Sequence, residues 1–138
     1  MGEKITELVG KSLQGRDLQG LNLVGNDFSY ASLKRANLEG ADLTEANLYG
    51  AILAGANCKD SVFRRAKLEQ IKAKGVILLG ADLSGANLRW ADLSGADLRN
   101  ANLTDVNLSK ANLLDAKLEN AIMDGADLTG AIFRRATV

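Results

Sequence analysis

Acidic and amide side chains recur along this 138-residue sequence, many of them directly before a Leu. Paired carboxylates can act as general acid and base, and Asp and Asn recur between Ala and Leu at Asp42, Asn47, Asp82, Asn87, Asp92, Asp97 and Asn102. Such chemistry also needs a concave pocket and shifted pKa values. Because these residues fall on repeat positions, the spacing favours a structural role. Histidine, the commonest general base and metal ligand, is absent.

The sequence contains a single cysteine, Cys58, which excludes internal disulfides and cysteine-based zinc sites. Cys58 occupies a position that is Leu in most of the repeats described below. This placement predicts a small buried side chain, because free Cys is among the most buried residue types. The sequence therefore predicts no catalytic, cofactor-binding or metal-binding residues.

The densest run of basic residues would indicate phosphate binding if its side chains shared one face. A chain that turns every few residues spreads them over several faces, which favours a solvated surface. The run consists of Lys59, Arg64, Arg65, Lys67, Lys72 and Lys74. Basic and acidic residues each number 17, so the net charge is zero and no overall field attracts nucleic acid or an anionic membrane. We expect neither as a partner.

Outward-facing aromatic and aliphatic side chains are the best candidates for contact with a partner protein. The aromatic candidates are Tyr30, Tyr49 and Trp90, and the four-repeat coil that the family resemblance described below implies would place Tyr30 and Trp90 in one corner column with Tyr49 beside it. Ile77 and Leu79 form a second outward apolar spot. The alternative is that all five are isolated surface residues, which are common on soluble proteins.

A period of five residues sets the elements that must hold these side chains. Every fifth residue from Leu8 to Val138 is a repeat centre, which gives 27 centres, of which 20 are Leu. Two residues before the centre, 18 of 27 positions are Ala. Two residues after it, 13 of 26 positions are Gly. The register runs through the chain without a slip.

This period excludes both regular elements. On an α-helix a step of five drifts by about 140°, so no apolar stripe forms. On a straight strand an odd step places successive centres on alternate faces. A chain that turns after each extended triplet can instead direct every Ala and every centre toward one axis, with Gly at the turns. The predicted core centres are Leu8, Leu13, Leu18, Leu23, Phe28, Leu33, Leu38, Leu43, Leu48, Leu53, Cys58, Phe63, Leu68, Leu78, Leu83, Leu88, Leu93, Leu98, Leu103, Leu108, Leu113, Leu118, Met123, Leu128 and Phe133.

Two runs carry a family resemblance: Ala-Asn-Leu-Glu-Gly-Ala-Asp-Leu-Thr-Glu-Ala-Asn-Leu at 36–48 and Ala-Asp-Leu-Ser-Gly-Ala-Asn-Leu-Arg-Trp-Ala-Asp-Leu at 81–93. They resemble the pentapeptide-repeat family, which is especially abundant in cyanobacteria, and the resemblance covers nearly the whole chain. It implies an all-β fold, a right-handed quadrilateral β-helix with four repeats per coil and about seven coils. The four sides come from the resemblance, because periodicity alone does not choose four over three or five.

The resemblance predicts one solenoid domain over residues 1–138, with 1–7 as an N-terminal lead-in or cap. Residues 71–80 depart most from the pattern, because Ile71 fills an Ala position and Ala73 a Leu position. We interpret this as a large-for-small exchange that roughly conserves core volume. The alternative is a bulge or loop in this segment.

Four repeats per coil would stack residues that are twenty apart. Favourable charge pairs are then expected between successive coils. These pairs are Glu39 with Lys59, Glu45 with Arg65, and Arg99 with Glu119. The two ends of a solenoid present backbone edges, and a weak homodimer through these ends is one way to cover them.

The sequence favours a non-catalytic module for protein–protein interaction or scaffolding, with an unidentified protein partner and no cofactor. The resemblance suggests an alternative, because some pentapeptide-repeat proteins imitate DNA and bind DNA gyrase, affecting quinolone resistance. Mimicry needs a strongly acidic rod, and this chain is neutral. An enzyme is the third possibility. No hydrophobic signal core or membrane-length apolar run is present, so we expect a cytoplasmic protein.

Overall fold

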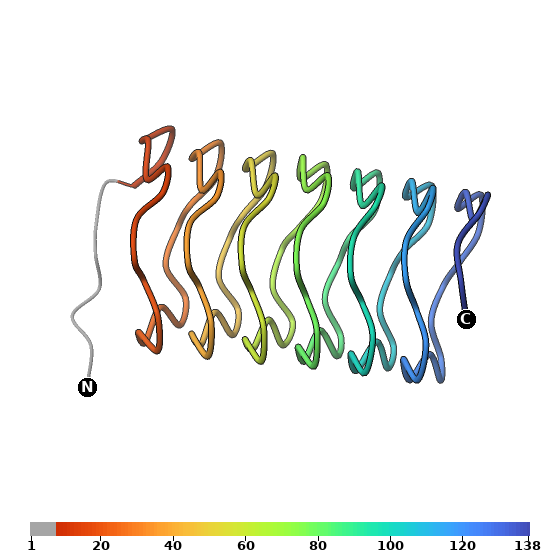
Figure 1. Cartoon of the computed structure of the whole chain (residues 1–138). Coiled ribbons are helices and arrows are strands. Elements are labelled where there is room, and N and C mark those ends of the chain that lie inside the picture. Colours follow the sequence, from red (N-terminus) through yellow and green to blue (C-terminus); the bar gives the residue numbers. More distant parts are fainter. Residues whose placement is uncertain (1–7) are drawn as a thin grey trace.

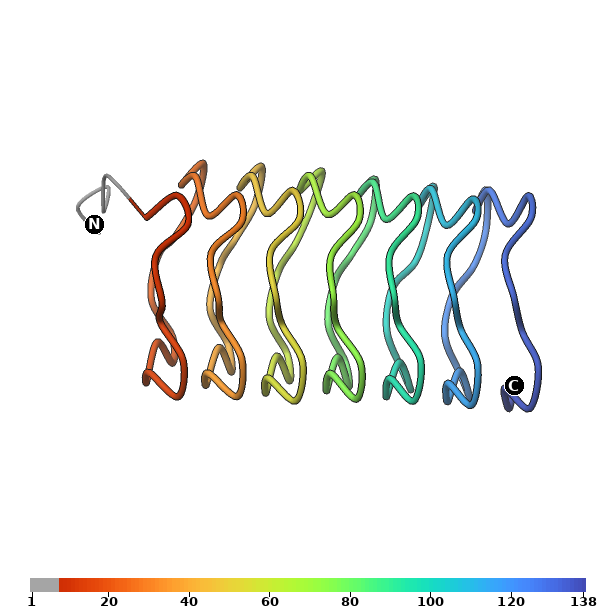
Figure 2. The ribbon, with the colours of Figure 1, turned by 90° about the horizontal axis from the view of Figure 1, so that it is seen from above.

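The chain winds into a rod of stacked coils in the computed structural model, which describes residues 8–138 (Figure 1). Figure 2 shows the same coils from above, again in sequence order along the rod. The described residues form no helix and no strand longer than one residue. Each repeat instead contributes one β-bridge residue, directly before the centre, and a two-residue turn directly after it. The predicted lead-in, residues 1–7, lies outside the described residues.

Parallel β-bridges fix the register between coils. Every bridge joins residues twenty apart, from Ser12 with Ser32 to Lys117 with Thr137. Twenty residues are four repeats, so the chain returns to the same side of the rod after four turns. Residues that differ by twenty therefore form a column along the rod, and each column has its own surface chemistry.

Backbone hydrogen bonds run alternately to the two neighbouring coils. The Leu43 N–H donates to the Val62 carbonyl at 2.6 Å, whereas the Asp42 N–H donates to the Leu21 carbonyl at 3.0 Å. The same pattern recurs in repeat after repeat. Because each repeat donates N–H groups to its neighbours, a proline in the ladder would remove a bond, and the sequence contains none.

Each repeat ends in a tight turn closed by a backbone hydrogen bond, such as Ala41 N–H to Leu38 carbonyl at 3.0 Å. The second turn residue has positive φ, for example +67° at Gly40. Positive φ at this position alone defines a type II turn, which favours Gly. Half of these positions are Gly, and the other half carry side chains despite the left-handed backbone.

The acidic and amide residues before the repeat centres stabilise the turns. The Asp42 Oδ1 accepts the Thr44 N–H at 3.0 Å and the Thr44 hydroxyl at 2.6 Å. The Asp92 Oδ1 accepts the same pair of bonds from Ser94, at 3.0 and 2.7 Å. Side chains of Asp and Asn commonly bond the backbone two residues on. This local bonding accounts for the periodic carboxylates that the sequence offered as candidates for acid–base chemistry.

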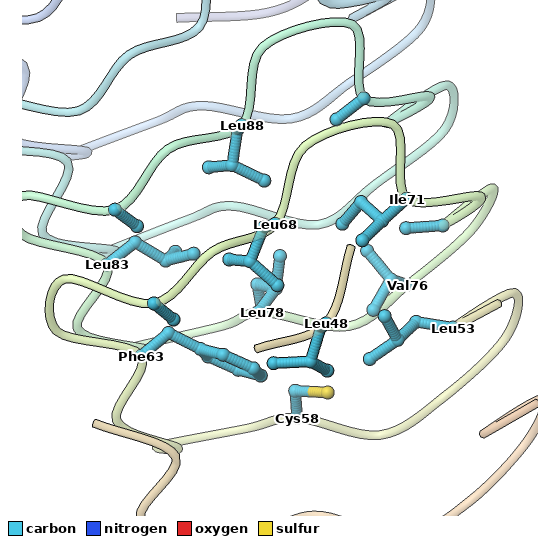
Figure 3. Close-up of a cluster of buried hydrophobic side chains, with 14 of the residues drawn as sticks. Leu48, Leu53, Cys58, Phe63, Leu68, Ile71, Val76, Leu78, Leu83 and Leu88 are labelled. Carbon is cyan, nitrogen blue, oxygen red and sulfur yellow. The ribbon is translucent and has the colours of Figure 1, made fainter. Parts of the chain in front are cut away.

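The core is a column of apolar side chains on the rod axis (Figure 3). From Leu23 to Leu118 every repeat centre is at most 3% exposed, and the Ala positions between them are equally buried from Ala31 to Ala116. Burial weakens at the ends, where four predicted centres are only partly buried, namely Leu13, Leu18, Met123 and Phe133.

Leu128 is the exception among the predicted core centres. Its side chain is 37% exposed, so its assignment to the buried core was wrong. The reason is its position in residues 119–138, which have a neighbouring coil on one side only. Side chains in this stretch therefore lack half of the packing that covers the inner coils.

Residues 71–80 keep the bridge register of the rest of the rod. Lys72 bridges Ile52 and Asp92, and Ile77 bridges Asn57 and Asp97. Ile71 and Ala73 are both buried, at 3% and 0% exposure. They line a cavity of only about 10 Å³ together with neighbouring centres, including several labelled in Figure 3. The larger side chain at one position thus nearly fills the space left by the smaller one.

Candidate functional site

The predicted aromatic residues lie along one column of turns. The Tyr30 N–H donates to the Tyr49 carbonyl at 2.8 Å, which places the two rings side by side on neighbouring coils. Their centroids are 5.7 Å apart, with an edge-to-face angle of 72°. Tyr30 is 61% exposed and Trp90 is 53% exposed, whereas Tyr49 is half-buried.

Trp90 belongs to the same column but lies three coils from Tyr30, about 14 Å along the rod. It has a different neighbour, because the Lys110 Nζ lies over the indole ring, 5.1 Å from its centroid. A cation over an exposed indole contributes about 0.5–1 kcal/mol. We call Tyr30, Tyr49, Trp90 and Lys110 the aromatic corner. It consists of two contact points on a rigid support rather than one continuous patch.

Both exposed aromatics of this corner occupy left-handed backbone. The φ angle is 58° at Tyr30 and 63° at Trp90. Bulky residues rarely adopt this region, and each such residue costs on the order of 1 kcal/mol or more. The sequence pattern placed both residues at turns but did not indicate this strain.

Ile77 and Leu79, the second predicted apolar spot, lie on a different side of the coil. Ile77 is 38% exposed and Leu79 is half-buried. Leu79 lines a shallow, open depression together with Arg99 and Lys117. The other residues of this depression also carry charged or amide groups. The structure therefore does not combine the five predicted residues into one site.

The basic run that the sequence offered for phosphate binding is distributed over several columns. Arg64 donates to Asp82 at 2.6 Å, and Arg65 lies 3.5 Å from Glu45. The Glu45–Arg65 contact was predicted from the twenty-residue spacing, and the structure confirms it. The other two predicted pairs form no ion pair in the described coils. Glu39 instead accepts the Asn57 side-chain amide at 3.3 Å.

Arg99 was expected to pair with Glu119 in the next coil but instead bonds a carboxylate in its own repeat. It makes two hydrogen bonds to Asp97, both 2.8 Å long. These bonds lower the pKa of the Asp97 carboxyl. Glu119 accepts the Thr137 hydroxyl, which lowers the pKa of Glu119. For Arg99, the carboxylate within its own repeat therefore competes successfully with the stacked Glu119.

The Cys58 thiol is fully buried, and burial raises its pKa to about 12. It therefore packs as a small apolar group, as its repeat position predicted. Among residues 8–138 no group of three or more His, Cys, Asp or Glu side chains is placed to hold a metal ion. The same residues contain no helix long and apolar enough to cross a membrane.

Parallel bridges every twenty residues, turns every five and an apolar axis define a β-solenoid of five-residue repeats. The family model of pentapeptide repeats, in eight copies, matches residues 8–44, 41–80, 81–113 and 111–138. The chain therefore belongs to the pentapeptide-repeat family. No curated protein matches the sequence.

Several solved structures are similar to this chain. Full-length QnrB1, a plasmid-mediated fluoroquinolone resistance protein, is 16% identical over 89% of this chain and 84% of that chain, with a TM-score of 0.55. A pentapeptide repeat protein from Nostoc PCC 7120 is 36% identical, and the match covers 64% of this chain and 66% of that chain, with a TM-score of 0.49. The likeness to QnrB1 is one of fold alone.

A third similar structure is HetL, a pentapeptide repeat protein involved in heterocyst differentiation regulation from the cyanobacterium Nostoc sp. strain PCC 7120. It is 28% identical, and the match covers 95% of this chain and 88% of that chain, with a TM-score of 0.28.

Proposed function

We propose that this protein is a non-catalytic protein–protein interaction or scaffolding module that contacts a partner protein through the aromatic corner. The observation that carries this proposal is the exposure of two large aromatic side chains, Tyr30 at 61% and Trp90 at 53%, on one column of turns. Glycine occupies half of the equivalent turn positions, where it removes strain of about 1 kcal/mol. The other half carry varied side chains in the same geometry, so the two aromatics are distinguished by their size and exposure, and exposed aromatics are enriched among the residues that dominate binding.

The rigidity of the rod supports this role. Tyr30 and Trp90 are held by turns whose neighbouring coils are hydrogen-bonded on both sides, so their separation of about 14 Å is fixed. A partner that meets both contact points loses little conformational freedom in the solenoid on binding. The non-catalytic part of the proposal is supported by the periodic carboxylates and amides, which accept turn hydrogen bonds.

A binding comparison of two glycine variants tests the aromatic corner. Trp90→Gly removes the ring and relieves its strained backbone, while Asn100→Gly relieves the same geometry, φ 60°, in another column. Partner capture from the native host, followed by affinity measurement with the recovered protein, should show loss of binding for Trp90→Gly only. Equal capture by wild type and Trp90→Gly, or no partner for any form, would contradict the proposal.

The finer architecture belongs to the same proposal. We infer a right-handed, four-sided coil with about seven turns that forms one domain over residues 1–138, supported by four repeats between bridged residues. We also propose that two copies of the chain form a weak homodimer through the solenoid ends, since exposed backbone edges favour pairing with another chain. Sedimentation at rising protein concentration measures this association directly. A single species of monomer mass at all concentrations would remove the homodimer.

A DNA-mimicking protein that binds a topoisomerase such as gyrase is the second candidate. Acidic turn residues on one side of the rod favour it, namely Glu45, Asp105 and Asp124. Arg64 and Arg65 interrupt this row and weaken the imitation of a phosphate backbone. A gyrase supercoiling assay separates the two candidates. Potent inhibition by the protein would place the second candidate first.

A further inference from the structure

Positive charge is concentrated in one turn column of this neutral chain. The turns at 14–15 and at every twentieth residue beyond are joined by hydrogen bonds such as Gly55 N–H to Lys74 carbonyl, 3.0 Å, and Asp115 N–H to Arg134 carbonyl, 2.9 Å. These turns hold five basic residues and one acid. The five, which we call the basic edge, are Lys34, Arg35, Lys74, Arg134 and Arg135.

The basic edge is available to a ligand, because all five side chains are exposed. Arg135 makes two hydrogen bonds to Asp115, at 2.8 and 3.1 Å. The other four basic residues form no ion pair with any residue in the described coils. Arg35 also lies along the column, since its Cγ is 3.5 Å from the point where a Cβ on Gly55 would be. The cations thus lie in three groups along one edge of the rod, at Lys34 and Arg35, at Lys74, and at Arg134 and Arg135.

The other side of the rod does not complement this row. Half a coil away, the turns around 24–25 carry three acids, but Arg64 and Arg65 lie among them. Arg64 pairs with Asp82, and Arg65 pairs with Glu45. Glu45 is therefore paired within the molecule, and the two arginines add positive charge to this side, so a second copy is a poor partner for the basic edge.

We propose that the basic edge binds an extended acidic segment of a partner protein. From Lys34 to Arg134 the row spans five coil steps, about 24 Å, which is the length of about seven extended residues. A single row matches a single chain, whereas a DNA duplex presents two phosphate strands. The columns of this edge contain no aromatic residue for stacking, on which binding of single-stranded nucleic acid depends. This surface is separate from the aromatic corner and extends the proposed function.

The test uses a fluorescent peptide of about eight glutamates, long enough to cover the row. We expect binding at low ionic strength that weakens as salt is added, because exposed charges are screened. Charge reversal by Lys34→Glu with Lys74→Glu should lower the affinity by about tenfold or more, since two attractions become repulsions. The matched control, Lys59→Glu with Lys67→Glu, changes the net charge equally at exposed positions in other columns and should retain binding.

Three results would overturn the proposal. The wild type could fail to bind the peptide, the control could lose as much affinity as the basic-edge variant, or a single-stranded oligonucleotide of equal charge could bind more tightly through the same two lysines. Trp90→Ala should leave peptide binding unchanged, which separates failure of this proposal from failure of the aromatic corner. Circular dichroism of each variant checks that the solenoid has formed.

Discussion

At the scale of the residue, burial decides the chemistry of Cys58. The thiol has no exposed surface, and its pKa is raised from 9.0 to about 12 by burial. At a pH between these two pKa values, the thiol is deprotonated in the unfolded chain but stays protonated in the folded chain. The contribution of this group to stability is therefore constant below pH 9.0 and falls by about 1.4 kcal/mol per pH unit above it.

Denaturant unfolding at increasing pH, compared between wild type and Cys58→Val, isolates this contribution from that of the lysines. The difference in unfolding free energy should be flat in the neutral range and should move in favour of the variant above pH 9.0. The native thiol should also resist alkylation until the protein is unfolded. Rapid labelling of the folded protein would show that the core opens around Cys58.

The turns are the first feature at the scale of the element, and two glycines within them separate strain from crowding. Gly40 and Gly50 have φ of +67° and +64°, but only a Cβ on Gly50 would meet another group, the Tyr30 ring at 2.9 Å. We expect Gly40→Ala to destabilise the fold by about 1 kcal/mol through its backbone. Gly50→Ala should cost more and should also displace the Tyr30 ring.

Unfolding curves measure the first effect and near-ultraviolet circular dichroism the second, because the signal depends on the packing of Tyr30 against Tyr49. The spectrum should change for Gly50→Ala and stay the same for Gly40→Ala. Identical spectra would mean that the Tyr30 ring is not displaced in Gly50→Ala, and equal unfolding free energies would mean that crowding against this ring adds no cost.

The core exchange in residues 71–80 gives a second element-scale prediction. Ile71→Ala alone should destabilise by about 2–5 kcal/mol because it leaves a cavity. Ala73→Leu alone should destabilise by about 1–3 kcal/mol because the existing cavity is only about 10 Å³. The double variant restores the Ala and Leu of the repeat, and we expect it to lie within about 1.5 kcal/mol of wild type.

Equilibrium unfolding of the three variants completes a double-mutant cycle. A coupling energy near zero would show that Ile71 and Ala73 do not share the same core space. A large favourable coupling would establish the exchange of volume between them.

The repeat positions of the fold could be predicted from the sequence because each repeat packs its Leu and Ala side chains in the same way. Leu at the centre and Ala two residues earlier were enough to identify the axis, as the burial of Leu88 and Ala86 illustrates. The number of repeats per coil was predicted from the family resemblance, because a five-residue period is compatible with coils of three, four or five repeats. The turn bonds of Asp42 and Asp92 were not foreseen, since their repeat position suggested only an outward side chain.

The candidate site was less predictable than the core. Tyr30 and Trp90 were placed in one column by arithmetic, but their separate neighbours depend on which way each ring lies. The predicted Arg99–Glu119 ion pair was wrong for a similar reason, because Arg99 has Asp97 within its own repeat as well as Glu119 in the next coil. A long flexible side chain can form ion pairs of similar free energy with several partners, and sequence spacing alone does not show which pair is the most stable.

At the scale of the whole molecule, stability should vary along the rod. Each coil contacts only its neighbours, so the inner coils are supported on both sides. We expect backbone amides of residues 43–98 to exchange with solvent much more slowly than those of 123–138, where Met123 and Leu128 are partly exposed. Hydrogen exchange followed by mass spectrometry measures this gradient. Uniform protection would indicate that the rod opens only as one unit.

Charge is also organised at this scale. A net charge of zero removes long-range attraction, yet the basic edge and the acidic turns lie half a coil apart. A partner that binds one side of the rod therefore contacts a charged surface, although the protein as a whole is neutral. Surface maps of individual columns are more informative for this fold than its isoelectric point.

The twenty-residue register has a consequence for changes in chain length. Duplication or loss of one whole coil leaves every later side chain on its original side of the rod and alters only the distance between contact points. Gain or loss of a single repeat also preserves the apolar axis, but it rotates everything downstream by a quarter of a coil. The core would tolerate such an event, while a surface such as the basic edge would be cut into two misaligned halves. Only insertion or deletion of whole coils of twenty residues therefore changes the length of the rod while keeping such a binding surface aligned.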